Sequence, residues 1–207
     1  VAPDSTIVLY SKKHNLYWMD KENFLKAVAD EKDSTIVENQ WTKDGVEHFG
    51  YGGYNRGMDN EDIEKMKNDK FPIRGYWSSD SKNFVYQKTD RRKIKDLWVI
   101  NSVGKKRPTL ETYKYHMAGE EAEYTHEILI FDIKSKEVRK VQIDSIKQKT
   151  ISYISGINIH SKRTKPSSYD DEFRPTLLLS DKGKIYFNIT SRDRKKMDVC
   201  RADINTG

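Results

Sequence analysis

The sequence predicts an all-β fold: a partial β-propeller built from antiparallel blades. Three observations lead to this prediction. A hairpin pattern occurs three times, strand-length apolar runs dominate the chain, and long helical periodicity is rare. Repeated units that cannot bury their own faces stack into modular arrays. We therefore expect residues 1–207 to form one partial propeller, a fragment of a seven- or eight-bladed one.

Each copy of the hairpin pattern has an Asp near a turn, an apolar strand, a charged turn and a second apolar strand. The copies span residues 3–20, 79–101 and 180–203. The intervals between them exceed the roughly 40–50 residues of a regular blade, which predicts about two irregular blades per interval. Trp18, Trp98 and Phe187 lie on the apolar strands and are predicted to be buried.

The remaining elements follow from local patterns. Residues 127–133 and 138–143 alternate around a polar turn and predict another hairpin. Further strands are predicted at 150–154 and 175–179, short helices at 21–30 and 60–70, and loops at 50–57 and 159–173.

Composition argues against several classes of partner. The net charge of +6 would suit nucleic acid, but Lys and Arg alternate with Asp and Glu along most of the chain. The densest basic clusters, 88–95 and 192–196, fall in predicted turns and are expected to be solvated. No run approaches the ~18 apolar residues of a membrane helix. We expect neither nucleic-acid binding nor membrane insertion by this segment.

Both ends of the sequence read as cuts inside a longer protein. Val1 leads directly into the first hairpin, and Gly207 stops at a turn of the kind that precedes a strand. A cut propeller leaves strand edges unpaired, and such edges pair with other chains. We expect the isolated fragment to form a homo-oligomer or to have disordered end strands.

Motifs that signal catalysis or a cofactor are missing from the sequence. It contains no G-x-S-x-G elbow, and its five histidines lack the spacing of a helical zinc site. The glycine-rich residues 50–57 lack the Gly-Lys-Ser/Thr of a phosphate-binding loop. Cys200 lies in an apolar strand and is expected to be buried. No catalytic residue, metal or cofactor is predicted.

Three acidic clusters are the residues of this sequence that most suggest a binding site. They are Glu61, Asp62 and Glu64; Glu120 and Glu121; and Asp170, Asp171 and Glu172. Adjacent carboxylates in a cleft could capture a cationic ligand, such as the free α-amine of a peptide. The alternative is a solvated helix start or loop.

The aromatic residues on the strands allow two interpretations. They are Tyr17, Trp18, Tyr76, Trp77, Phe84 and Trp98. Packing of large rings between sheets is the interpretation that the pattern favours. A platform on which sugars or bases stack is the alternative, and only composition supports it.

Several motifs follow one another in a specific order. Residues 76–81 read YWSSDS, 111–120 read ETYKYHMAGE and 191–200 read SRDRKKMDVC, with TKDG at 42–45. This order resembles the N-terminal β-propeller of bacterial-type dipeptidyl peptidase IV serine peptidases, of the prolyl oligopeptidase family. The corresponding family patterns are W-S-P-D-G/S, Y-x-Y-P-x-A/P-G-E, in which His116 replaces the usual Pro, and S-R-D-x-x-x-x-D-V-C.

The resemblance implies a function for the parent protein. The chain would be the non-catalytic propeller portion of a dipeptidyl aminopeptidase IV-like serine exopeptidase, gating and positioning peptide N-termini for proteolysis. The Ser–Asp–His triad would lie in an α/β-hydrolase domain outside this chain. We therefore expect the chain alone not to hydrolyse Xaa-Pro or Xaa-Ala chromogens. A periplasmic or cell-envelope location is implied by the resemblance only.

The resemblance also suggests a binding site. In the family, a Glu–Glu pair on the propeller holds the substrate amine, within the pattern D-W-V-Y-E-E. That pattern is absent between Gly45 and Trp77. Glu61 and Asp62 are the nearest acidic neighbours by position, and with Glu64 they are the candidate substrate-binding residues.

A competing class of function is a stand-alone propeller that binds a protein or glycan partner. A G-x-S-x-G motif downstream of Gly207, followed by Asp and His, would favour the peptidase. A stop codon or further blades would favour the binding module.

Overall fold

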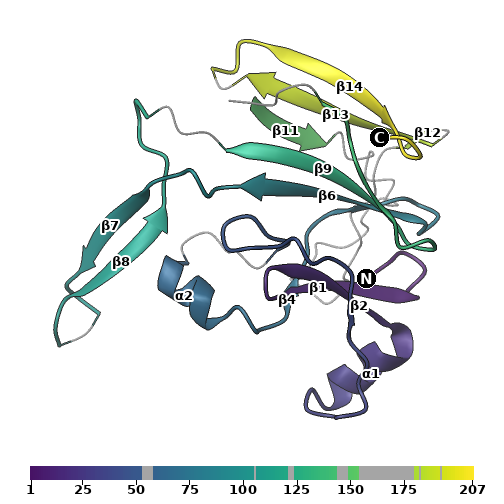
Figure 1. The fold of residues 1–207 in the computed structure, drawn as a ribbon, viewed down its shortest axis with the longest axis horizontal. Helices are drawn as coiled ribbons and strands as arrows, with labels where there is room; N and C mark the ends of the chain where they lie inside the picture. Colours follow the sequence, from purple (N-terminus) through teal and green to yellow (C-terminus); the bar gives the residue numbers. More distant parts are fainter. Residues whose placement is uncertain are drawn as a thin grey trace, which may run out of the picture.

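The computed structural model describes residues 1–52, 58–104, 106–120, 124–143, 149–153, 180–181, 183–191 and 193–207. Three antiparallel sheets stack on one another, and a two-stranded hairpin projects from them (Figure 1). Within the described ranges there are two helices, α1 (Lys21–Ala29) and α2 (Asn60–Lys65). Neither is long and apolar enough to cross a membrane. The predicted all-β partial propeller is confirmed.

The first sheet has the strand order β3-β2-β1-β4. Its strands are β1 (Ile7–Lys12), β2 (Asn15–Asp20), β3 (Asn39–Gln40) and β4 (Phe71–Pro72). The predicted hairpin between β1 and β2 is confirmed. Its two turn residues, Lys13 and His14, have φ of 49° and 64°. Two successive positive φ values are typical of the type I′ turn that joins twisted strands.

Helix α1 follows β2 directly, and the predicted helix at residues 21–30 is confirmed. The Asp20 carboxylate accepts a hydrogen bond from the Asn23 backbone N–H at 2.8 Å, which caps the helix start. Leu25 and Val28, which helical periodicity assigns to one apolar face, are 56% and 68% exposed. The helix therefore lies on the surface and buries little of that face.

The second sheet has the order β10-β9-β6-β5. Its strands are β5 (Tyr76–Trp77), β6 (Asn83–Asp90), β9 (Thr125–Asp132) and β10 (Val138–Lys140). The predicted hairpin of β9 with β10 is confirmed. The predicted pairing of β6 with the strand at 96–101 is wrong, because β6 pairs with β9 along eight residues. This pairing aligns two continuous apolar runs, which a sheet covered on both faces requires.

The strand at 96–101 belongs instead to a projecting hairpin, which we call the arm. It consists of β7 (Asp96–Asn101) and β8 (Thr109–Lys114), which pair only with each other in the described structure. Trp98 is 72% exposed, so its predicted burial is wrong. The arm lies on none of the three sheets (Figure 1), and nothing described covers this ring. Phe187 is buried as predicted, and Trp18 is half-buried.

The third sheet is built around a central strand, β13. Its strands are β11 (Lys149–Tyr153), β12 (Ser180–Asp181), β13 (Lys184–Ser191) and β14 (Met197–Asp203). The predicted hairpin of β13 with β14 is confirmed, and β11 matches the strand expected at 150–154. Cys200 on β14 is only partly buried, contrary to expectation. The strand predicted at 175–179 and the loop predicted at 159–173 lie outside the described residues.

The interval between successive copies of the hairpin pattern is not explained by extra blades. In the described residues, each copy contributes strands to a different one of the three four-stranded sheets, and no further four-stranded sheet lies between them, so the prediction of about two blades per interval is wrong. The added length of the first interval includes α1 and α2, and that of the second includes the arm. Insertions between the strands therefore account for the long spacing.

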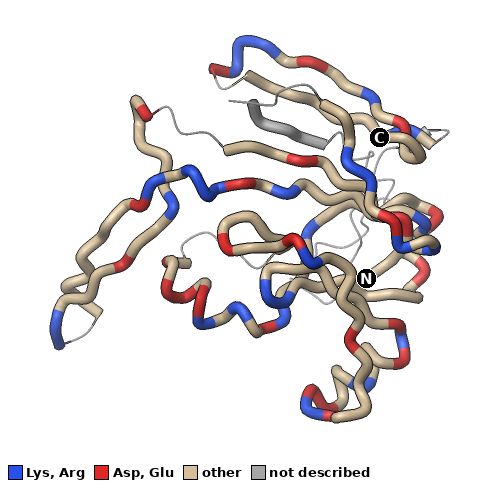
Figure 2. Tube along the Cα trace, in the orientation of Figure 1, with Lys and Arg blue, Asp and Glu red and all other residues tan. Residues whose placement is uncertain are grey.

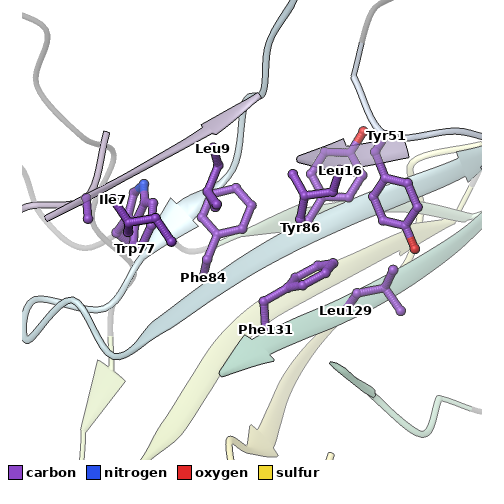
Figure 3. Close-up of a cluster of buried hydrophobic side chains, with 10 residues drawn as sticks. Ile7, Leu9, Leu16, Tyr51, Trp77, Phe84, Tyr86, Leu129 and Phe131 are labelled. Carbon is purple, nitrogen blue, oxygen red and sulfur yellow. The ribbon is translucent and has the colours of Figure 1, made fainter. Parts of the chain in front are cut away.

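Two apolar cores separate the sheets. Between the first and second sheets, Phe131 lies among aromatic rings. Its ring centroid is 5.2 Å from that of Trp41. It is 6.1 Å from that of Tyr51 and 6.2 Å from that of Phe84, both of which lie near it in Figure 3. Between the second and third sheets lie aliphatic residues and Phe187. Successive residues of β6 and β9 face opposite cores, because side chains alternate along a strand.

The repeated turns are closed by Ser and Asp side chains in the same way. At Asp80, the carboxylate accepts hydrogen bonds from the Ser78 hydroxyl at 2.6 Å and the Lys82 N–H at 3.1 Å. At Asp193, it accepts them from the Ser191 hydroxyl at 2.6 Å and the Lys195 N–H at 3.1 Å. Such contacts stabilise tight turns. Asp80 is the recurring Asp of the second copy, whereas Asp193 lies in the charged turn between β13 and β14 of the third copy. These two Asp side chains therefore have the same structural role in two different turns of the pattern.

Lys88 differs from its expected role as a solvated turn residue. It lies on β6 and its side chain is fully buried. The ammonium is 2.5 Å from an Asp44 carboxylate oxygen and 3.9 Å and 4.5 Å from the ring centroids of Phe49 and Tyr51. Because a buried charge needs a partner, these contacts hold residues 44–51 against the second sheet.

Candidate functional site

The three predicted site residues, Glu61, Asp62 and Glu64, all lie on α2. The helix starts where the Asp59 carboxylate accepts a hydrogen bond from the Asp62 N–H at 2.7 Å. Acidic residues in the first turn and Lys65 in the last turn complement the helix dipole. No residue of α2 is buried, so the carboxylates lie at the surface.

The carboxylates of α2 do not form a paired acidic cluster. Glu61 lies 2.5 Å from the ammonium of Lys65, and Glu64 forms an ion pair with Lys67. The first contact joins neighbours on one face of the helix, and the second joins the helix to the turn that follows it; both offset negative charge. In the described structure, the Asp62 carboxylate has no hydrogen bond or ion pair. Asp62 is therefore the candidate whose charge is least offset.

Helix α2 is fastened to the base of the arm by Asn60. Its side-chain amide donates to an Asp96 carboxylate oxygen at 3.0 Å and to the Thr112 hydroxyl at 3.1 Å. Burial alone would raise the pKa of Asp96, but hydrogen bonds from Asn60 and Lys114 outweigh it and lower that pKa. The ionised carboxylate is thus favoured, and the helix is held beside β8.

The structure adds two acidic residues, Glu111 and Asp59, that the sequence did not single out. Glu111 on β8 accepts hydrogen bonds from Asn101 at 2.8 Å and from the Tyr113 hydroxyl at 2.5 Å. The pKa of Tyr113 is raised to about 12, first by this hydrogen bond, then by burial, and then by the charges of Glu111, Asp59 and Asp62. The three carboxylates therefore act on the same region. Because side chains alternate along a strand, the sequence can predict that Glu111 and Tyr113 share one face of β8. Only the tertiary structure shows that they lie near α2.

The other acidic clusters are less informative. The Glu120 carboxylate accepts a hydrogen bond from the Met117 N–H at 3.0 Å and lies 3.7 Å from Lys95, so it serves the local turn. Glu121 and the cluster at 170–172 lie outside the described residues, as do residues 53–57 of the glycine-rich loop.

A cavity beside α2, lined in part by His14, Lys67 and Phe71, has a volume of about 20 Å³. That is room for a single water.

Among the described residues, no three His, Cys, Asp or Glu side chains are grouped so that they could hold a metal ion. The chemistry available at α2 and β8 is therefore that of carboxylates, which attract cations and accept hydrogen bonds.

Comparisons with known proteins identify the family. A family model described as the dipeptidyl peptidase IV (DPP IV) N-terminal region matches residues 70–207. That range begins after α2, so the candidate residues lie outside it. No curated protein matches the chain.

Solved structures share the fold. Dipeptidyl peptidase 4 of Porphyromonas gingivalis has a TM-score of 0.61 at 14% identity, over 99% of this chain and 23% of that chain. A dipeptidyl aminopeptidase IV-type protein of Bacteroides ovatus has a TM-score of 0.55 at 12% identity, over 93% of this chain and 21% of that chain. The chain thus spans less than a quarter of either relative. Because the family model matches more than half of it, this chain belongs to the family of dipeptidyl peptidase IV N-terminal regions.

Proposed function

We propose that this chain is the non-catalytic propeller portion of a dipeptidyl aminopeptidase IV-like serine exopeptidase, and that it gates and positions peptide N-termini for cleavage. The observation that carries this proposal is the family match over residues 70–207. The similarity to solved dipeptidyl peptidase structures supports the fold on which it depends. The catalytic triad and the peptide bond to be cleaved would lie in a hydrolase domain of the same protein.

Within this function, we propose that the α-ammonium group of the substrate binds at α2, with Asp62 as its main contact. Asp62 has no ion-pair partner in the described structure, while the charges of Asp59 and Glu111 act on the same region. An ammonium–carboxylate contact of this kind is worth about 1.5–3 kcal/mol when partly shielded from water. Asp62 is exposed, so the lower end applies, or about tenfold in kcat/KM.

The test uses the full-length protein with the variants Glu61→Gln and Asp62→Asn combined. Peptides with free and with acetylated N-termini are compared. We expect kcat/KM for free peptides to fall about tenfold or more while the rate on acetylated peptides stays unchanged. Asp69→Asn is the matched control, an exposed carboxylate four residues beyond α2.

The outcomes separate the site from the function. An active enzyme whose double variant keeps its full preference for free amines would exclude α2 and leave the peptidase assignment intact. A full-length protein that lacks a serine hydrolase domain would instead refute the peptidase. The alternative, a propeller that binds a protein or glycan, would then apply.

A further inference from the structure

A histidine lies where the arm joins the rest of the molecule. His48 belongs to residues 44–51, the segment that Lys88 holds against the second sheet. Its backbone carbonyl accepts a hydrogen bond from the Arg91 N–H at 2.9 Å, and Arg91 is the first residue after β6 on the way to the arm. The His48 side chain is only 11% exposed. The imidazole is therefore packed into the junction between this segment and the base of the arm.

Charged groups from each element at this junction face the imidazole. They are Glu47 on the same segment, Asp96 on β7, Lys114 on β8 and Arg91 between β6 and β7. A Glu47 carboxylate oxygen lies 3.1 Å from Nε2 of His48. Figure 2 shows basic and acidic segments next to one another where the arm leaves β6. Among these five groups, only a histidine ordinarily changes its charge between pH 5 and 8.

Asp96 connects this junction to α2. Its carboxylate lies 3.1 Å from the Lys114 ammonium and accepts a hydrogen bond from Asn60 at 3.0 Å. Within the described ranges, β7 and β8 pair with no strand of the three sheets. The position of the arm therefore depends on contacts at its base, among them those of Asn60 and of the His48 carbonyl.

A proton on His48 would weaken these contacts. Burial disfavours the charged imidazolium, and the nearby cations Lys114 and Arg91 add to this effect, while Glu47 and Asp96 oppose it. The balance lowers the pKa of His48 from 6.5. The attached arm thus binds fewer protons than an arm whose base is hydrated. The stability of the attachment is present above pH 6.5 and is lost as pH falls below it.

We propose that His48 makes the base of the arm a proton-sensitive latch, which holds the arm against the molecule near neutral pH and loosens when the imidazole is protonated. Protonation places a third cation beside Lys114 and Arg91 in a site with little access to water. Opening of the contact between residues 44–51 and the arm hydrates the imidazolium, which favours the loosened state. Because Asn60 docks on Asp96, α2 loosens together with the arm.

Hydrogen exchange of the full-length protein, measured by mass spectrometry at two pH values and corrected for intrinsic rates, tests the proposal. The reporting amides are those of Arg91, Ile94 and Tyr115, which are all hydrogen-bonded at the base of the arm. Between about pH 7.5 and about pH 5.5, a histidine with an ordinary pKa in the open state changes an opening equilibrium by at most about tenfold. We therefore expect protection of these amides to fall by about three- to tenfold.

Two substitutions remove the titrating group. His48→Asn suits the positive φ of 61° at this position, since Asn adopts such values more readily than most residues, and His48→Gln is a second replacement. Both variants should lose the fall in protection. His126→Gln is the matched control, because burial also lowers the pKa of His126 but its ring contacts Gln87 and Thr89 of β6. This variant should keep the full response of the arm.

Three results would overturn the proposal. The first is equal protection at both pH values in the protein without substitutions. The second is a fall of the same size in either His48 variant. The third is loss of the response in His126→Gln.

Discussion

The ion pair between Lys88 and Asp44 should respond unequally to removal of its two partners. The Lys88 side chain is fully buried, whereas that of Asp44 is 61% exposed. If Asp44→Asn removes the negative charge, the ammonium stays in a pocket formed by Phe49 and Tyr51. If Lys88→Met removes the positive charge, the Asp44 carboxylate can be hydrated, and it still accepts a hydrogen bond from the Tyr51 hydroxyl at 3.0 Å.

The magnitudes follow from burial. Leaving a buried charge without its partner costs about 3–5 kcal/mol. Two effects reduce this cost. Water can reach the exposed side of residue 44, and the two aromatic rings still attract the ammonium, so we expect Asp44→Asn to cost about 2 kcal/mol. Lys88→Met conserves most of the volume and should cost less than about 1 kcal/mol. The double variant should then be nearly as stable as Lys88→Met alone.

Urea unfolding of the protein and its variants measures these differences, with the slope m checked for constancy. Glu22→Gln is the control, because it removes an exposed ion pair with Lys26 and should cost less than about 0.5 kcal/mol. If Lys88→Met destabilises the fold as much as Asp44→Asn, the ammonium does not depend on Asp44, and the argument from burial is refuted.

Two further predictions concern pH and the backbone. Burial, followed by the charge of Arg91, lowers the pKa of His126 from 6.5, so the folded state binds fewer protons than the unfolded state just below that pH. The free energy of unfolding should therefore fall as pH drops through 6.5, and less steeply in His126→Gln; equal slopes in urea titrations of both proteins would contradict this. Gly45→Ala should cost about 2 kcal/mol or more, because its Cβ would lie 2.0 Å from the His14 carbonyl oxygen. Gly104→Ala, with no contact below 3.4 Å, should change stability by less than about 0.5 kcal/mol, and equal losses in thermal unfolding would count against the steric reason.

Features set by neighbouring residues were predictable from the sequence. Short apolar runs identified β1, β9 and β13, and three of the predicted hairpins, β1 with β2, β9 with β10 and β13 with β14, were placed correctly. The start of α1 follows from Asp20, a capping residue immediately before the helix. These patterns depend on contacts within a few residues, which the order of amino acids specifies directly.

The candidate site was predictable only in part. The sequence placed Glu61, Asp62 and Glu64 on a short helix, and they lie there. It did not indicate that Lys65 and Lys67 engage two of them, or that Glu111 lies near the same helix. Contacts between a helix and a distant strand depend on the path of the chain between them, and local spacing carries no information about that path.

By itself, the sequence determined the class of fold, the positions of most strands and the family. The tertiary structure alone decided that β6 pairs with β9, that Trp98 is exposed and that Lys88 is buried. The physical reason is common to all three. An apolar run or a charged turn indicates whether each residue tends to be buried or exposed. The actual surroundings of a residue depend on which distant strand pairs with its own strand and on which sheet covers that strand's face.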